Sequence, residues 1–125
     1  MLRSVVIAFA LSLGATGSAL AQDAAAGEKV FAKCKACHVI DAPTNRVGPS
    51  LHGVIGRTAG TLEGFKYSES MIQHGKDGLV WSNETIDQYL SDPKGFIPKN
   101  KMAFPGLKKP EDRANVIAYI DQASK

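Results

Sequence analysis

The only two cysteines of the chain lie three residues apart in the stretch FAKCKACHVI, and a histidine directly follows the second. Two thiols at this spacing are compatible with three kinds of chemistry. Cys34 and Cys37 can form a redox-active dithiol, supply half of a metal site, or act as two tethers for a cofactor. In the last case, His38 stands beside the tethers as a candidate metal ligand.

The surrounding sequence does not favour a dithiol, a zinc site or a structural disulfide. A thioredoxin-type pair follows a strand and sits at a helix N-terminus, whereas this pair lies near the C-terminal end of a helical pattern. A structural zinc site needs four ligands, but there is no second cysteine pair, and His52 and His74 are scattered. A disulfide across two intervening residues would close a very small loop and stabilise little.

The tether hypothesis agrees with the spacing. Residues at i and i+3 on a helical turn share one face, so both cysteines can reach the edge of one flat macrocycle. The imidazole of His38 then stands over the metal, and its nitrogen suits iron. Cys-x-x-Cys-His is the attachment signature of c-type haem. The sequence therefore predicts one haem c, covalently bound to Cys34 and Cys37, with His38 as an axial iron ligand.

Four residues are candidates for the second axial position of the iron. His52 follows the tethers closely in a Gly-rich stretch, from which the opposite face of the haem is hard to reach. Met71 and His74 belong to a short amphipathic segment, where a methionine is more often a core residue. Met102 lies in an irregular loop bracketed by two prolines, far along the chain from the tethers. We predict Met102 as the sixth ligand.

Helical patterns dominate the rest of the chain, and no segment shows a clear alternating strand pattern. Pro- and Gly-rich stretches at 41–64 and 92–110 predict two long loops, which are unusual in a compact chain unless they surround something large. We expect an all-α fold of four to five short helices and long loops wrapped around a covalently bound haem. The predicted helices follow Asp23, span 68–73, follow the cap Ser82, and begin at Pro110.

The N-terminus has the features of a secretory signal: Arg3, an apolar run at 5–13, and Ala19 and Ala21 before a cleavage point. The apolar run is too short to span a bilayer. We predict a signal peptide at 1–21 and one domain at 22–125. Loss of Arg3 leaves a mildly basic exported chain with a formal charge of +2. No later stretch is long enough to cross a membrane, so a soluble periplasmic protein is expected.

In addition, the chain resembles the class I c-type cytochromes, most closely the bacterial cytochrome c2 group related to mitochondrial cytochrome c. The resemblance spans nearly the whole mature chain. It rests on Gly27 and Phe31 in the first helix and on the stretches CKACH, VGPSLHGVIGRTAG, GFKYS, LVWSNETIDQYLSDPK, IPKNKMAFPGLKK and RANVIAYI. The resemblance implies the cytochrome c fold.

The resemblance also implies roles for further residues of a haem pocket. The carbonyl of Pro49 would accept a hydrogen bond from His38, which steadies a neutral imidazole ligand. The inner haem propionate would be surrounded by Arg57, Tyr67 and Trp81, because a buried carboxylate needs charged or hydrogen-bonding partners. From the residue type alone, Trp81 is better explained as a core aromatic.

Three more positions are assigned by the resemblance. The hydroxyl of Tyr89 would lie near the methionine sulfur, and Gly27 would let the first helix approach the last one closely, against Tyr119. Asn100 stands where many relatives have a threonine that contributes to propionate bonding. The stretch SMIQHGKDG is longer than in mitochondrial relatives, which favours a bacterial c2-type protein.

The function expected from these observations is that of a soluble periplasmic one-electron carrier, not an enzyme. The resemblance implies a bc1-type complex as donor and a photosynthetic reaction centre or terminal oxidase as acceptor. We expect a monomer that is not membrane-inserted and has no nucleic-acid partner. Two other classes are considered: a ligand-binding or catalytic haem protein with a labile sixth ligand, and a thiol oxidoreductase without haem.

Lysines cluster in the two segments that would border an exposed haem edge. Five lysines and no acidic residue lie between 94 and 109, and two more flank the first tether. A solvated loop kept soluble by lysine explains such a run in an unassigned protein. Around a haem edge, the same charge predicts docking of acidic partner surfaces. The predicted docking residues are Lys33, Lys35, Lys99, Lys101, Lys108 and Lys109.

Overall fold

The structure, a computed structural model, describes residues 23–125; the signal peptide predicted at 1–21 lies outside these residues. In the described part of the chain there are five helices and no strand, apart from an isolated antiparallel bridge between Thr58 and Val80. The all-α prediction is confirmed. The helices are α1 (Ala24–Phe31), α2 (Glu69–Lys76), α3 (Asn83–Ser91), α4 (Pro93–Phe96) and α5 (Pro110–Ala123).

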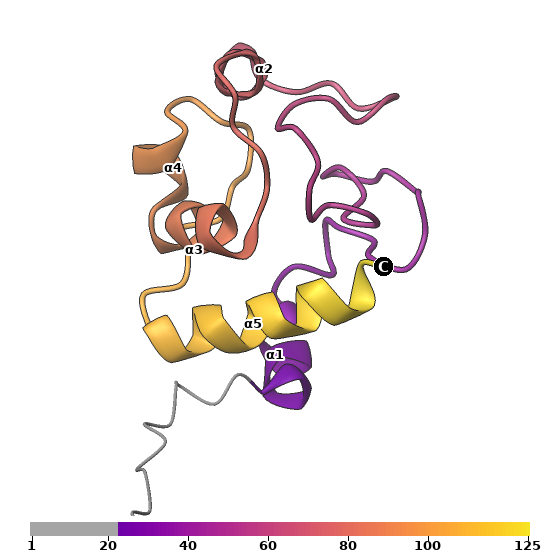
Figure 1. The fold of residues 1–125 in the computed structure, drawn as a ribbon, viewed down its shortest axis with the longest axis vertical. Helices are drawn as coiled ribbons and strands as arrows, with labels where there is room; N and C mark the ends of the chain where they lie inside the picture. The colour runs from indigo at the N-terminus through magenta and orange to yellow at the C-terminus, as the bar shows by residue number, and fades with distance from the viewer. Residues whose placement is uncertain (1–22) are drawn as a thin grey trace, which may run out of the picture.

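Helices α1 and α5 pack closely, although they lie at opposite ends of the described chain (Figure 1). The side chain of Asp23 caps α1 by accepting hydrogen bonds from the next turn, as predicted. The helices approach at Gly27, where a Cβ would collide with the backbone carbonyl of Asn115. Phe31 is 1% exposed, and its ring centroid lies 5.1 Å from that of Tyr119. This contact fixes the segment that follows α1.

Helix α3 begins with a capping box in which Ser82 and Thr85 satisfy each other's backbone N–H groups. We predicted that the chain would be loop from 92 to 110, which is wrong for α4. Asp92 accepts a hydrogen bond from the backbone of Gly95, and Pro93 supplies a fixed φ at the first helical position. These two local features together stabilise one more helical turn.

Helix α5 begins at Pro110, as predicted, and buries Val116, Ile117 and Ile120 on one face. Arg113, in the first turn of α5, makes a contact with another helix. Its Nε donates a 2.7 Å hydrogen bond to the Asp87 carboxylate, which ties α5 to α3.

Helix α2 starts after Ser68, whose hydroxyl oxygen accepts a 3.0 Å hydrogen bond from the backbone of Met71. It extends three residues beyond the predicted end at 73. Gly75 permits close packing against the preceding loop, since a Cβ there would collide with the carbonyl of Ala59. The longer stretch that distinguishes this chain therefore forms a helix packed onto the loop at 59.

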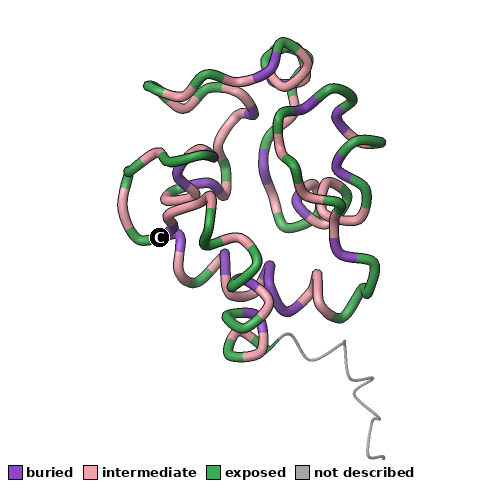
Figure 2. Tube along the Cα trace, turned by 180° about the vertical axis from the view of Figure 1, so that it is seen from behind, coloured by how far each residue is buried: buried purple, intermediate pink, exposed green. Residues whose placement is uncertain are grey.

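The long segments between the helices are folded rather than extended into solvent. Figure 2 shows that buried positions alternate with exposed ones along the loops as well as the helices. The buried loop residues include Ile40, Val54, Ala59, Ile97 and Leu107, which belong to the same hydrophobic cluster as Phe31 and Val116. Helices and loops together therefore form the walls of the site described next.

Candidate functional site

A cavity of about 300 Å³ lies between α2, α3, α5 and the long loops. Most of its lining is apolar and includes Leu51, Val54, Ile86, Val116 and Ile120. All ten residues that were assigned to the haem or its pocket line this one cavity. They are Cys34, Cys37, His38, Pro49, Arg57, Tyr67, Trp81, Tyr89, Asn100 and Met102.

The two cysteines lie on a helical turn directly after α1. The backbone N–H groups of Cys37 and His38 both donate to the carbonyl of Cys34, at 3.1 and 2.9 Å. In the described residues the two thiols are free. Burial raises the pKa of the Cys34 thiol to about 11, and the neighbouring Cys37 adds to the rise. A redox-active dithiol needs a lowered thiol pKa, so this environment does not favour dithiol chemistry.

The imidazole of His38 is held in one tautomer. Its Nδ1 donates a 2.7 Å hydrogen bond to the carbonyl of Pro49, the contact that the resemblance implied. Burial lowers the pKa of His38, and this hydrogen bond only partly opposes that effect. The ring is therefore neutral near pH 7, with its proton on Nδ1. The Nε2 lone pair is then the one that can bind a metal.

A cationic and aromatic group occupies another part of the lining. Arg57 donates to the carbonyls of Ser50 and His52, at 2.8 and 2.5 Å. Two backbone hydrogen bonds tie the stretch 56–57 to Trp81, which is 9% exposed. The hydroxyl of Tyr67 lies near enough to Arg57 for the guanidinium to act on its pKa, although burial raises that pKa overall. A guanidinium with a neighbouring hydroxyl and indole can hold a carboxylate in an otherwise apolar cavity.

The loop that carries Met102 is braced from inside by Asn100. The side-chain amide of this buried residue donates to the carbonyls of Pro93 and Ile97, both at 2.9 Å. Its carbonyl oxygen accepts a 2.9 Å hydrogen bond from the backbone of Met102. Both side-chain N–H groups of Asn100 are thus used on carbonyls at the start of α4 and directly after its end. Its geometry holds Met102 in place, and it leaves no spare amide donor for a propionate.

Tyr89 and Lys99 also shape the position of Met102. The Tyr89 hydroxyl donates to the Met102 sulfur at 4.0 Å, as the resemblance implied. Burial raises the pKa of Tyr89 to about 12, so this hydroxyl stays protonated at neutral pH. Lys99, three residues before Met102, has φ of 59°, and is the only non-glycine in the described chain with positive φ. The loop therefore includes a backbone conformation that costs a lysine about 1 kcal/mol or more.

Of the other candidate ligands, only Met71 faces the cavity. His74 donates from Nδ1 to the carbonyl of Ser70 at 2.7 Å, within α2. Among residues 23–125, the buried Nδ1 of His52 finds no hydrogen-bond partner, and His52 does not line the cavity. Sequence reasoning treated Met71 as a core residue because of its amphipathic segment. It missed that α2 presents this thioether to the same cavity as Met102.

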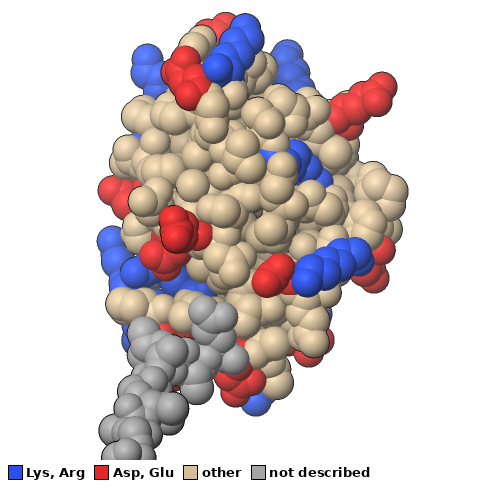
Figure 3. Space-filling view, viewed as in Figure 1, with Lys and Arg blue, Asp and Glu red and all other residues tan. Residues whose placement is uncertain are grey.

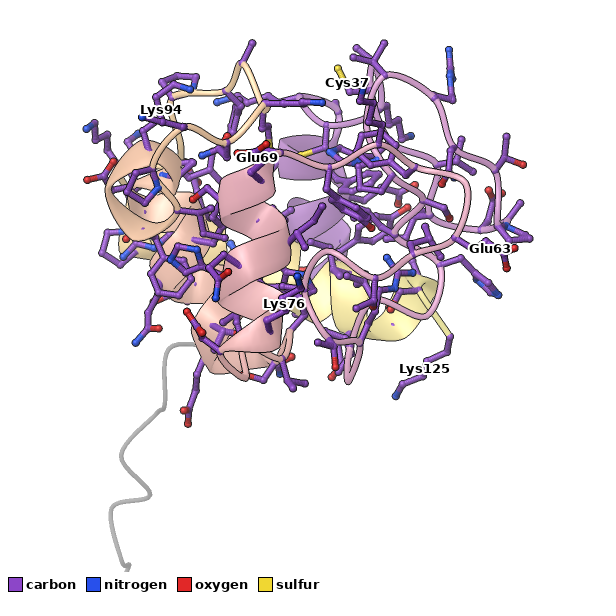
Figure 4. All side chains as sticks on the ribbon, turned by 90° about the horizontal axis from the view of Figure 1, so that it is seen from above. Cys37, Glu63, Glu69, Lys76, Lys94 and Lys125 are labelled. Carbon is purple, nitrogen blue, oxygen red and sulfur yellow. The ribbon has the colours of Figure 1, made fainter. Side chains whose placement is uncertain are left out.

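The six predicted docking lysines are all exposed. Two of them, Lys33 and Lys101, line the cavity mouth, and Lys101 donates from Nζ to the carbonyl of Lys66 at 3.3 Å. Figure 4 shows Lys94 and Cys37 along one edge of the molecule, with Lys76 and Lys125 toward the other side. On the face in Figure 3, basic and acidic side chains are interspersed around a largely uncharged middle. Positive charge therefore does not cover that face.

The donor set fits a flat, mostly apolar group that carries a metal and carboxylates. One wall offers two thiols and a neutral imidazole, the braced loop offers a thioether, and Arg57 offers a positive charge. No helix in residues 23–125 is long and apolar enough to cross a membrane.

Comparison with known proteins gives consistent matches along the described chain. The family model for cytochrome c matches residues 24–124. Cytochrome c2 iso-2 of Magnetospirillum fulvum is 59% identical over 90 residues, which cover 72% of this chain and 91% of that protein. Cytochrome c2 of Afifella marina is 47% identical over 97 residues, covering 77% and 78% of the two chains.

Solved structures show the same similarity. Ferricytochrome c2 from Rhodopseudomonas palustris superposes with a TM-score of 0.74 at 41% identity, covering 81% of this chain and 98% of that one. Cytochrome cH from Methylobacterium extorquens superposes with a TM-score of 0.72 at 44% identity, covering 80% and 98%.

Proposed function

Because the chain belongs to the cytochrome c family, as a class I c-type cytochrome of the c2 group with a covalently bound haem c, we propose that it is a periplasmic one-electron shuttle with His38 and Met102 as the iron ligands. The observation that carries this proposal is that the candidate ligands and tethers share one cavity. This cavity brings the neutral imidazole of His38, the thioether of Met102 and both thiols into one apolar enclosure.

The proposed roles of the residues follow from their contacts. Cys34 and Cys37 would hold the haem edge by thioether bonds, and the Pro49 carbonyl would keep the His38 ring in its binding tautomer. Asn100 would fix the position of Met102 through the backbone, and the Tyr89 hydroxyl would donate to the sulfur of Met102. The bound haem supplies an iron that changes between its ferrous and ferric states.

The environment of the cavity would favour electron transfer over ligand chemistry. A thioether ligand and a largely apolar pocket would both stabilise the ferrous state, which gives a positive potential. If His38 and Met102 both bind the iron, small molecules would be excluded from it. Tethered and braced ligands move little when the charge changes. These properties suit a carrier that transforms no substrate, so we propose that the chain is not an enzyme.

The proposed partners are membrane redox complexes with acidic docking surfaces. In this proposal a bc1-type complex supplies the electron, and a photosynthetic reaction centre or a terminal oxidase accepts it. The predicted secretory signal at 1–21 supports a periplasmic location. The carrier would work as a monomer, because a transient encounter with each partner is enough for electron exchange.

The visible spectrum of the purified protein tests the proposed class of function. We expect a low-spin c-type spectrum, with the weak band near 695 nm, a general marker of sulfur bound to ferric haem iron. A high-spin spectrum that changes when CO or azide is added would instead support a ligand-binding or catalytic haem protein. A colourless protein with titratable thiols would support a thiol oxidoreductase.

Docking through the lysines predicts a strong effect of salt. We expect the second-order rate of oxidation by an acidic-faced redox protein to fall roughly tenfold or more with added salt, because electrostatic steering contributes about 10 to 10³-fold. At about 0.15 M ionic strength the Debye length is only about 8 Å. The substitutions Lys99→Glu and Lys101→Glu should slow the reaction at low salt, as measured by stopped-flow absorbance.

Matched charge reversals distinguish docking from solubility. Lys76→Glu and Lys125→Glu change the net charge equally, but these residues lie away from the edge that carries Cys37 (Figure 4). They should therefore slow the reaction much less. A rate independent of salt, or equal effects from all four variants, would mean that the lysines act only in solubility.

A further inference from the structure

Gly48 lies directly against the imidazole of His38. A Cβ placed on Gly48 would be 2.8 Å from Nδ1 and 2.8 Å from Nε2, and closer still to Cε1. Real Cβ atoms do not approach other heavy atoms this closely. Any residue other than glycine must therefore displace either the ring or its own backbone. Gly48 is buried and does not have positive φ, so this contact, and not backbone conformation, is what requires a glycine here.

The distances show that this contact is with the face of the ring. An atom beyond the ring edge, in the plane of the ring, would lie much farther from both nitrogens than from Cε1. The Cβ position lies at similar distances from Cε1 and from both nitrogens, as expected for an atom above the plane of the ring. The Cα of Gly48 therefore covers one face of the imidazole on the side of Cε1. It limits how far the ring can tilt or rotate about its bond to Cβ.

The backbone around Gly48 cannot easily move away to make room. The N–H of Gly48 donates to the carbonyl of Cys37 at 2.9 Å, and the N–H of Leu51 donates to the carbonyl of Val39 at 2.8 Å. These two hydrogen bonds lie on either side of His38. They hold the stretch 48–51 alongside the stretch 37–39, so an added methyl group would press mainly on the ring.

We propose that Gly48 is a positioning residue for His38, whose bare Cα sets the tilt of the imidazole and so the direction of Nε2 into the cavity. The Pro49 hydrogen bond alone leaves the ring free to pivot about the line from Nδ1 to the carbonyl oxygen. The Gly48 contact removes that freedom. The inference rests on the proposed role of His38 as an iron ligand.

The test is the substitution Gly48→Ala in the haem-loaded protein. The low-spin electron paramagnetic resonance g-values of the ferric state report the orientation of the axial ligands. We expect Gly48→Ala to shift these g-values. Gly75→Ala is the matched control, because its Cβ would collide with the carbonyl of Ala59 and Gly75 does not line the cavity. It should lower the melting temperature without shifting the g-values.

Unchanged g-values in haem-loaded Gly48→Ala, or equal shifts in both variants, would overturn the inference. If Gly48→Ala fails to load haem, the proposal is tested instead by nuclear magnetic resonance on the unmodified, reduced protein. A nuclear Overhauser effect between the Hα protons of Gly48 and the Cε1 proton of His38 is expected, and its absence would overturn the proposal.

A separate measurement distinguishes a failure of this inference from a failure of the proposed ligation by His38. In the unmodified ferric protein with ¹⁵N-labelled histidine, strongly shifted His38 ring resonances identify it as the iron ligand. If these shifts are present and Gly48→Ala has no effect on the g-values, only the positioning role fails. If His38 shows no such shifts, the proposed ligation itself fails.

Discussion

We expect Met102→Ala to convert the spectrum of the haem-loaded protein from low-spin to high-spin, and to let the iron bind azide in the ferric state and CO in the ferrous state. Met102 is the residue whose backbone N–H donates to the side chain of Asn100. The substitution removes its sulfur, which accepts a hydrogen bond from the Tyr89 hydroxyl. Without a thioether the ferrous state loses stabilisation, so the midpoint potential falls. Truncation of a partly buried methionine also lowers the free energy of unfolding, by about 2 kcal/mol.

Met71→Ala is the matched control for this experiment, because Met71 is the other methionine that lines the cavity. It should lose a comparable amount of packing while keeping the low-spin spectrum and the band near 695 nm. An unchanged spectrum in Met102→Ala would contradict the assignment. If Met71→Ala lost the band instead, the ligand would be the thioether of α2.

We expect the double substitution Cys34→Ala and Cys37→Ala to abolish covalent attachment of the haem to the chain. When the unmodified protein is treated with acidified acetone, the haem should stay with the precipitated polypeptide, because thioether bonds survive the extraction. In the double variant any bound haem should pass completely into the organic layer. Absorbance of the two fractions measures the partition, and the mass of the polypeptide shows whether the cofactor is attached.

The single variants provide the control for this second prediction. Cys34→Ala and Cys37→Ala each leave one thiol on the same helical turn, so one thioether bond should still keep the haem on the chain. Free haem in the organic layer from the unmodified protein would refute covalent attachment through these residues.

The features that could be predicted from the sequence are those encoded locally. The caps at Asp23 and Ser82 and the proline at 110 mark helix starts by contacts within one turn, and the structure has all three helices. The Cys-x-x-Cys-His spacing likewise places both thiols on one turn without knowledge of the fold. Helix α4 was missed because its two signals, at Asp92 and Pro93, lie in a stretch rich in proline and glycine.

Contacts between distant segments could not be obtained from local patterns. The hydrogen bond from His38 to Pro49 was expected only through the resemblance to relatives, because it depends on the path of the loop between these residues, which are eleven positions apart. The contact of Gly48 with the imidazole was not foreseen, since a glycine in a loop has many possible causes. The hydrogen bonds from the side-chain amide of Asn100 to Pro93 and Ile97 were likewise not predictable from the sequence, because they depend on the packing of this loop against α4.

The apolar cavity occupies the place that side chains would fill in another domain of this size. A chain of about 100 residues has little core of its own, so the cofactor completes it. A dissociable ligand would stabilise the fold by RT ln(1 + [L]/Kd), and that contribution would vanish on dilution. A covalently bound haem stays on the unfolded chain, so mass action does not apply. Each molecule would keep part of its own core through every unfolding event, so its stability would not depend on the concentration of free haem around it.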